Sequence, residues 1–133
     1  MSRGVRAVRG ATTIDGDTRE EMEGKVVELL ELMLERNDCS GDDIISALFT
    51  ATGDLDQHFP AAAARTFLPA DVPVMCAREL AIEGSLERCV RIMMHLESDR
   101  TRSEIQHVYR GGALVLRPDL IGSAIDAGEE GRL

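Results

Sequence analysis

Three arginines stand inside predicted strands or at their ends, where a sheet could hold their guanidinium groups in fixed positions. Arg9 ends the first predicted strand, Arg91 lies in the middle of a later one, and Arg117 ends the last. A guanidinium recognises carboxylates and phosphates through two parallel hydrogen bonds, and a charge buried without a partner is costly. The three arginines together therefore favour a site for a small polycarboxylate over simple solvation.

Arg91 also allows structural interpretations, to which the sequence gives about the same weight as a ligand role. It could form an internal ion pair with Glu79 or Glu97, or it could lie on an exposed face of the sheet. Arg9 and Arg117 share this ambiguity. The chain has one lysine among its 15 basic residues, so arginine dominates its positive charge. Several other arginines are expected to be solvated, among them Arg36, Arg100 and Arg102.

The cysteines and histidines are the next candidates for catalysis or metal binding: Cys39, Cys76, Cys89, His58, His95 and His107. The cysteines are odd in number and lack CxxC spacing, so we expect neither a disulfide framework nor a zinc site. A thiol enzyme built on Cys76 needs a nearby base, but nothing in the sequence places a histidine beside it. The histidines are scattered, and no metal site is expected.

The glycine pair Gly111 and Gly112 does not indicate a nucleotide site. The surrounding GGALVL has neither the GxGxxG nor the Walker spacing, so a hairpin turn between two strands is the preferred interpretation. No cofactor is predicted.

The composition limits the function classes further. A length of 133 residues fits one domain, and a net charge of −9 argues against nucleic acid and anionic membranes as partners. Residues 15–43 carry most of this charge, which leaves the rest nearly balanced. The sequence has no apolar run long enough to span a membrane and no signal-like N-terminus, so a cytoplasmic location is expected.

Alternation and helical periodicity predict an α+β fold. Thr18 and Glu21 form a capping box that opens the most clearly periodic segment, a helix over Thr18 to Arg36. The other predicted elements are a strand Val5 to Arg9 ended by Gly10, a strand Ile44 to Thr50, a helix Ala61 to Phe67, a strand Pro73 to Ala77, an alternating strand Arg88 to Glu97, a capped turn Thr101 to Glu104, and strands His107 to Tyr109 and Ala113 to Leu116. Residues 1–120 are expected to form one domain, and residues 121–133 a mobile tail.

Six segments, taken in order, resemble the monofunctional chorismate mutases of the AroH class. They are RGATT at Arg9 to Thr13, ATGDL at Ala51 to Leu55, FPAAAAR at Phe59 to Arg65, PVMCAREL at Pro73 to Leu80, CVRIMMH at Cys89 to His95, and HVYRGGALVLRPDL at His107 to Leu120. The resemblance implies conversion of chorismate to prephenate by a homotrimer. It also implies an α/β barrel-like assembly, with a mixed sheet, helices outside and three sites between adjacent subunits.

The resemblance also assigns residues. Arg91 would stabilise negative charge on the ether oxygen, Arg9 would bind a substrate carboxylate with help from Tyr109, and Glu79 with Cys76 would meet the ring hydroxyl and the positive side. The rest of the pocket would comprise Phe59, Ala61, Arg65, Val74, Met75, Leu116 and Arg117. Two positions depart from some members of the class: Ala62 replaces a basic residue and Met75 replaces a threonine.

Two other functions remain open on the sequence. A trimeric, non-catalytic protein that binds small carboxylates or acts as a regulator would use the same arginines. A carboxylate such as Glu79 facing the ligand argues against a simple dianion binder. A thiol enzyme that uses Cys76 is the weaker possibility.

Overall fold

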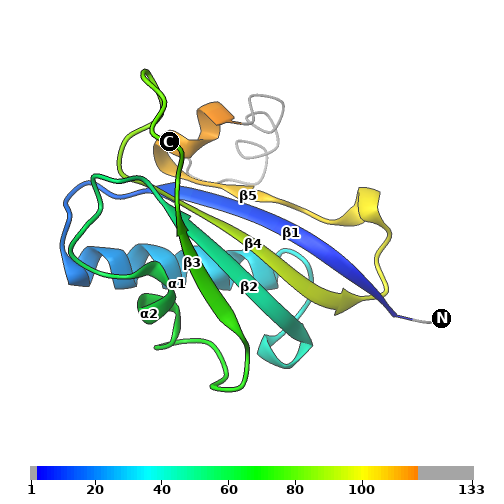
Figure 1. The fold of residues 1–133 in the computed structure, drawn as a ribbon. Helices are drawn as coiled ribbons and strands as arrows, with labels where there is room; N and C mark the ends of the chain where they lie inside the picture. The colour runs from blue at the N-terminus through cyan, green and yellow to red at the C-terminus, as the bar shows by residue number, and fades with distance from the viewer. Residues whose placement is uncertain (1–2, 117–133) are drawn as a thin grey trace.

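One five-stranded sheet organises the computed structural model, which describes residues 3–116 (Figure 1). Its strand order is β3-β2-β4-β1-β5. The elements are β1 (Gly4–Thr13), α1 (Arg19–Glu35), η1 (Gly41–Asp43), β2 (Ile44–Ala51), α2 (Pro60–Ala64), β3 (Val74–Arg78), β4 (Cys89–Ser98), η2 (Arg102–Glu104), β5 (Val108–Tyr109) and η3 (Gly111–Leu116). β4 pairs antiparallel with β1 and β2, whereas β3 and β5 add parallel edges. The predicted α+β class with a mixed sheet is confirmed.

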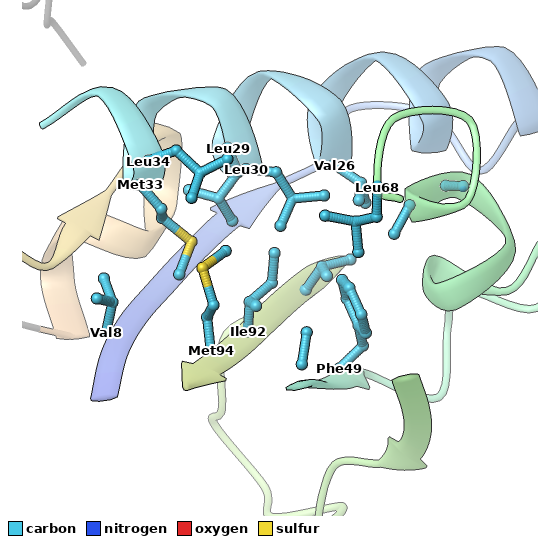
Figure 2. Close-up of a cluster of buried hydrophobic side chains, with 14 of the residues drawn as sticks. Val8, Val26, Leu29, Leu30, Met33, Leu34, Phe49, Leu68, Ile92 and Met94 are labelled. Carbon is cyan, nitrogen blue, oxygen red and sulfur yellow. The ribbon is translucent and has the colours of Figure 1, made fainter. Parts of the chain in front are cut away.

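The main core lies between the sheet and α1. The helix contributes a buried stripe at helical spacing, and alternate residues of the strands meet it from below (Figure 2). Members of this core include Val8, Met22, Val26, Leu29, Leu30, Met33, Phe49, Ile92 and Met94. Because α1 and α2 both pack on this one face, neither helix covers the opposite face of the sheet.

The first strand is longer than predicted, because Gly10 lies inside β1 rather than ending it. A Cβ atom added at Gly10 would lie 2.5 Å from the sulfur of Met33 and 3.3 Å from a methyl group of Leu29. The glycine therefore permits close packing of α1 on the strand, and no turn is involved.

The helix starts follow the predicted caps with small differences. Thr18 Oγ1 accepts the backbone N–H of Glu21, as predicted, but the Glu21 carboxylate accepts the N–H of Gly16 instead of that of Thr18. The helix predicted at Ala61 to Phe67 forms as α2, with Pro60 at its first position, where proline is favoured, but it ends at Ala64 instead of Phe67. The capped turn at Thr101 is present as η2.

The prediction of a strand over Ala113 to Leu116 is wrong. Gly111 has a φ of +56°, and the chain then winds into η3 because the N–H of Gly112 donates to Oγ1 of Thr13. This turn carries Leu114 onto the sheet face opposite α1. There it forms a second buried cluster with Ala11, Cys89, Tyr109 and Ala113.

Some predictions concern residues beyond those described. Arg117 and the expected tail at residues 121–133 lie outside residues 3–116, as does the end of the expected 1–120 domain. Within residues 3–116, no helix has both the length and the apolar character needed to cross a membrane.

Asn37 joins the end of α1 to the segment that precedes β5. Its side chain is almost fully buried, donates to the carbonyls of Met33 and Gln106 at 2.8 Å each, and accepts the N–H of Gln106 at 2.7 Å. One side chain thus satisfies three backbone groups from two distant parts of the chain.

We expect Asn37→Ala to lower the free energy of unfolding by about 2–4 kcal/mol, because it leaves buried backbone groups without partners. Urea denaturation at one fixed protein concentration measures this loss. Gln57→Ala is the control, since the exposed Gln57 amide donates to the adjacent Asp56 and its loss should change stability by less than about 0.5 kcal/mol. Equal stability of the two variants would contradict the assignment.

Candidate active site

The strand register brings two of the three predicted arginines, Arg9 and Arg91, to the sheet face opposite α1. Arg91 of β4 stands opposite Thr50 of β2 on one side and Ala11 of β1 on the other. Arg9 stands opposite Met93, two residues along β4 from Arg91. Residues two apart on a strand share a face, so Arg9 and Arg91 are diagonal neighbours across the β1 and β4 pair.

Arg91 is paired with Glu79, one of the two carboxylates considered from sequence. Its Nε lies 3.1 Å from Oε2 of Glu79, and 35% of the Arg91 side chain is exposed. Nε is itself buried and makes no aligned hydrogen bond with any residue that the structure describes. Arg91 and Glu79 thus form an ion pair, and a guanidinium has five N–H donors, so others can bind a ligand.

Glu79 is held in place from two directions. Its backbone N–H donates to the carbonyl of Ala51, which fixes the chain just after β3. Its carboxylate also accepts a short hydrogen bond from the hydroxyl of Thr50. Sequence reasoning missed Thr50, although one signal was present: it is a polar residue at the end of an otherwise apolar strand.

Arg9 and Tyr109 lie together beside this pair. The guanidinium carbon of Arg9 is 5.8 Å from the centre of the Tyr109 ring, within range of a cation–π contact. Tyr109 is buried in the cluster formed with η3. The parallel pairing of Ala11 with Tyr109 puts this ring in the same row as Arg91.

A cavity of about 630 Å³ opens next to Arg91. Leu116, a predicted pocket residue, lines it together with Thr13 and the loop at residues 84–88. The lining combines the Arg91 cation and apolar side chains with the charged residues Asp15, Glu87 and Arg88. Glu79 contacts the Arg91 guanidinium. This is the chemistry expected of a site that binds a small, charged organic molecule.

Cys76 lies on the other face of the sheet. Its strand neighbour Phe49 points into the core, and its sulfur accepts the N–H of Ala61 in α2 at 3.2 Å. Burial raises the pKa of the Cys76 thiol, so it is protonated at neutral pH and is a poor nucleophile. One chain therefore does not bring Cys76 to the Arg91 and Glu79 pair.

A second cavity, of about 440 Å³, lies on the side of Cys76. Phe59 lines it, with 71% of its side chain exposed, and so do His58 and Arg78. Of the predicted site residues, Phe59 and Cys76 line this second cavity, whereas Arg91 and Leu116 line the first.

The remaining predicted pocket residues have varied positions. Arg65 directs its guanidinium to the carbonyls of Pro69, Ala70 and Val72, so it braces the loop after α2 in the single chain. Val74 is half-buried against the core, whereas Met75 is 66% exposed on the face that carries Arg91. Within residues 3–116, no group of three His, Cys, Asp or Glu side chains could hold a metal ion.

Comparison with known proteins gives a consistent result. The family model "Chorismate mutase type I" matches residues 5–120. The chain is 42% identical over 117 residues to "Chorismate mutase AroH" of Bacillus subtilis, which covers 87% of this chain and 92% of that protein. It is 41% identical to "Chorismate mutase AroH" of Thermus thermophilus over 87% of this chain and 96% of that one.

A solved structure agrees with these sequence matches. The chorismate mutase from Clostridium thermocellum superimposes with a TM-score of 0.79 at 46% identity, covering 82% of this chain and 97% of its own. The residues matched by the family model include Arg9, Glu79 and Arg91. On this sequence and fold similarity, the chain belongs to the chorismate mutase type I family.

Proposed function

We propose that this protein converts chorismate to prephenate, and that Arg91, Glu79 and Arg9 carry the reaction. The observation that supports these assignments best is the Arg91 and Glu79 ion pair at 3.1 Å, which lies beside Arg9 on one face of the sheet. Membership of the chorismate mutase family supplies the substrate.

The reaction fits a site made of cations and a carboxylate. A Claisen rearrangement is concerted, so it needs no nucleophile and no obligatory proton transfer. The enzyme must hold the enolpyruvyl arm over the ring, and fixed polar groups can supply that positioning on binding. As the ether bond breaks, negative charge grows on its oxygen and positive charge grows on the ring fragment.

Arg91 is the group for the ether oxygen. A guanidinium fixed in a strand stabilises developing negative charge as an oxyanion hole does, and it needs no reorganisation at the moment of reaction. The contact with Glu79 leaves other guanidinium donors of Arg91 to point to the ligand. Glu79, held by Thr50, supplies negative charge toward the ring hydroxyl and the positive ring fragment.

Arg9 is the group for a substrate carboxylate. Its contact with the Tyr109 ring orients the guanidinium, and the Tyr109 hydroxyl can add a hydrogen bond to the same carboxylate. This contact is made in the ground state and in the transition state alike, so its main effect is on affinity.

A homotrimer would bring residues on the two faces of the sheet into one site. Apolar side chains remain exposed on the sheet face that carries Arg91, among them Val5, Leu48 and Met75. Such a patch favours contact with another subunit. We propose that the Cys76 and Phe59 cavity of one subunit joins the Arg91 cavity of the next, which would unite both groups in one cleft.

The cellular location is part of the proposal. Cys39, Cys76 and Cys89 are all free thiols. Unpaired cysteines are typical of reducing compartments, which supports a cytoplasmic location.

Arg91→Ala should lower kcat by roughly a hundredfold to a thousandfold, the usual loss when one oxyanion donor is removed. Arg91→Lys keeps the charge but loses the planar fork, and it should recover only part of the rate. The assay follows the loss of chorismate absorbance. Arg19→Ala removes an exposed arginine of α1 and serves as the control. Unchanged turnover in Arg91→Ala would refute its role, and wild-type binding without turnover would favour a carboxylate-binding protein.

Cys76→Ser should keep kcat within about tenfold of wild type, because it retains an acceptor for the Ala61 N–H and a neutral hydrogen bond contributes only about 1 kcal/mol. Removal of a covalent nucleophile lowers kcat by several orders of magnitude. A loss of that size in Cys76→Ser, measured in the same assay on folded protein, would support a thiol enzyme instead.

Leu48→Glu should weaken the assembly, because it puts a charge on the exposed apolar face. Light scattering after size-exclusion chromatography should give wild type a mass three times the 14.5 kDa of one chain, and the variant a smaller mass with lower activity. Ser103→Glu, a charge added to the exposed η2, should leave the mass unchanged. A fully active wild-type monomer would exclude the shared cleft.

A further inference from the structure

The backbone of Arg9 is anchored by a side chain. Its N–H donates to Nδ1 of His107 at 3.0 Å, across 98 residues of sequence. This bond lies just before the short parallel pairing of β1 with β5, where Gly10 stands opposite Val108. It therefore fixes the strand at the residue whose guanidinium contacts Tyr109.

A side chain accepts the Arg9 N–H here because the expected backbone partner is bonded elsewhere. If the parallel ladder continued by one step, the Arg9 N–H would donate to the carbonyl of Gln106. That carbonyl instead accepts from Asn37, whose Oδ1 also binds the Gln106 N–H. The peptide at Gln106 is thus turned toward α1, and the imidazole of His107 replaces it as acceptor.

His107 must present an unprotonated Nδ1 to accept this bond, which defines the neutral tautomer with its proton on Nε2. The imidazole lines a cavity of about 330 Å³ with Arg6, Arg102 and His95.

We propose that His107 is a positioning residue for Arg9 in the binding of the substrate carboxylate. His107 is also two residues before Tyr109. The hydrogen bond between Arg9 and His107 therefore joins the two segments that carry the Arg9 guanidinium and the Tyr109 ring. The proposal rests on the proposed function, since it assumes that Arg9 binds substrate. His107 itself does not need to touch the ligand.

The test compares His107→Asn with His107→Leu. The Oδ1 atom of asparagine stands about where Nδ1 of histidine does and can accept the Arg9 N–H, whereas leucine fills similar space without an acceptor. Gln106→Leu is the control, because it puts leucine at the neighbouring exposed side chain and keeps the backbone bonds. Urea denaturation of each variant gives its stability.

His107→Leu should raise KM for chorismate roughly tenfold while kcat stays within about threefold, because a contact shared by the ground and transition states is weakened. Hydrogen exchange of the Arg9 amide should become faster. His107→Asn should restore both KM and slow exchange, and Gln106→Leu should match wild type.

Two results would overturn the proposal: an unchanged KM in His107→Leu despite faster exchange at Arg9, or a His107→Asn variant with KM as impaired as that of His107→Leu at wild-type stability. Absence of chorismate turnover in the wild-type protein would instead refute the proposed function. The exchange rates would still report whether His107 holds the Arg9 backbone, so the two failures are distinguishable.

Discussion

The register of β4 between β1 and β2 is the constraint on which the rest of the structure depends. The two antiparallel pairings put Val90, Ile92 and Met94 against α1 and turn Arg91 to the opposite face. A slip of one residue would exchange the two faces and drive Arg91 into the core without its partner. Burial of the apolar face against α1 therefore also fixes where the charge of the site stands.

Charge compensation follows from that placement. Glu79 directly follows β3, Thr50 lies in β2 and Arg91 lies in β4. Glu79 contacts both Arg91 and Thr50, so three neighbouring strands position one polar group each. Such a set stays partly exposed at the mouth of a cavity, which lowers the desolvation cost that a buried ion pair would carry. The strongly acidic segment of residues 15–43 contains α1, which packs on the other side of the sheet. The acidic side chains of α1 are thus separated from Arg91, although Asp15 and Glu87 line the cavity beside it.

Much of the fold could be predicted, because its patterns are local. The helix that opens at Thr18 and the alternation of β4 each show their period within one segment. The arginines Arg9, Arg91 and Arg117 stood out by their positions in predicted strands, whereas the full set of candidate site residues came from the resemblance of ordered motifs to the AroH class. Their roles remain proposals. The interpretation of Gly10 and of Ala113 to Leu116 failed because each depends on a distant contact, with Met33 in one case and Thr13 in the other.

The sequence by itself determined the α+β class, the faces of the strands and the kinds of side chain available for chemistry, since periodicity and residue type are properties of short segments. Only the tertiary structure decided which of them meet. In the folded chain Arg91 pairs with Glu79 rather than Glu97, and Cys76 lies on the other face of the sheet. Arg65 donates to loop carbonyls, and the backbone N–H of Arg9 donates to His107. These outcomes depend on strand order and on which backbone groups are already satisfied, and both are set by contacts between residues far apart in the chain.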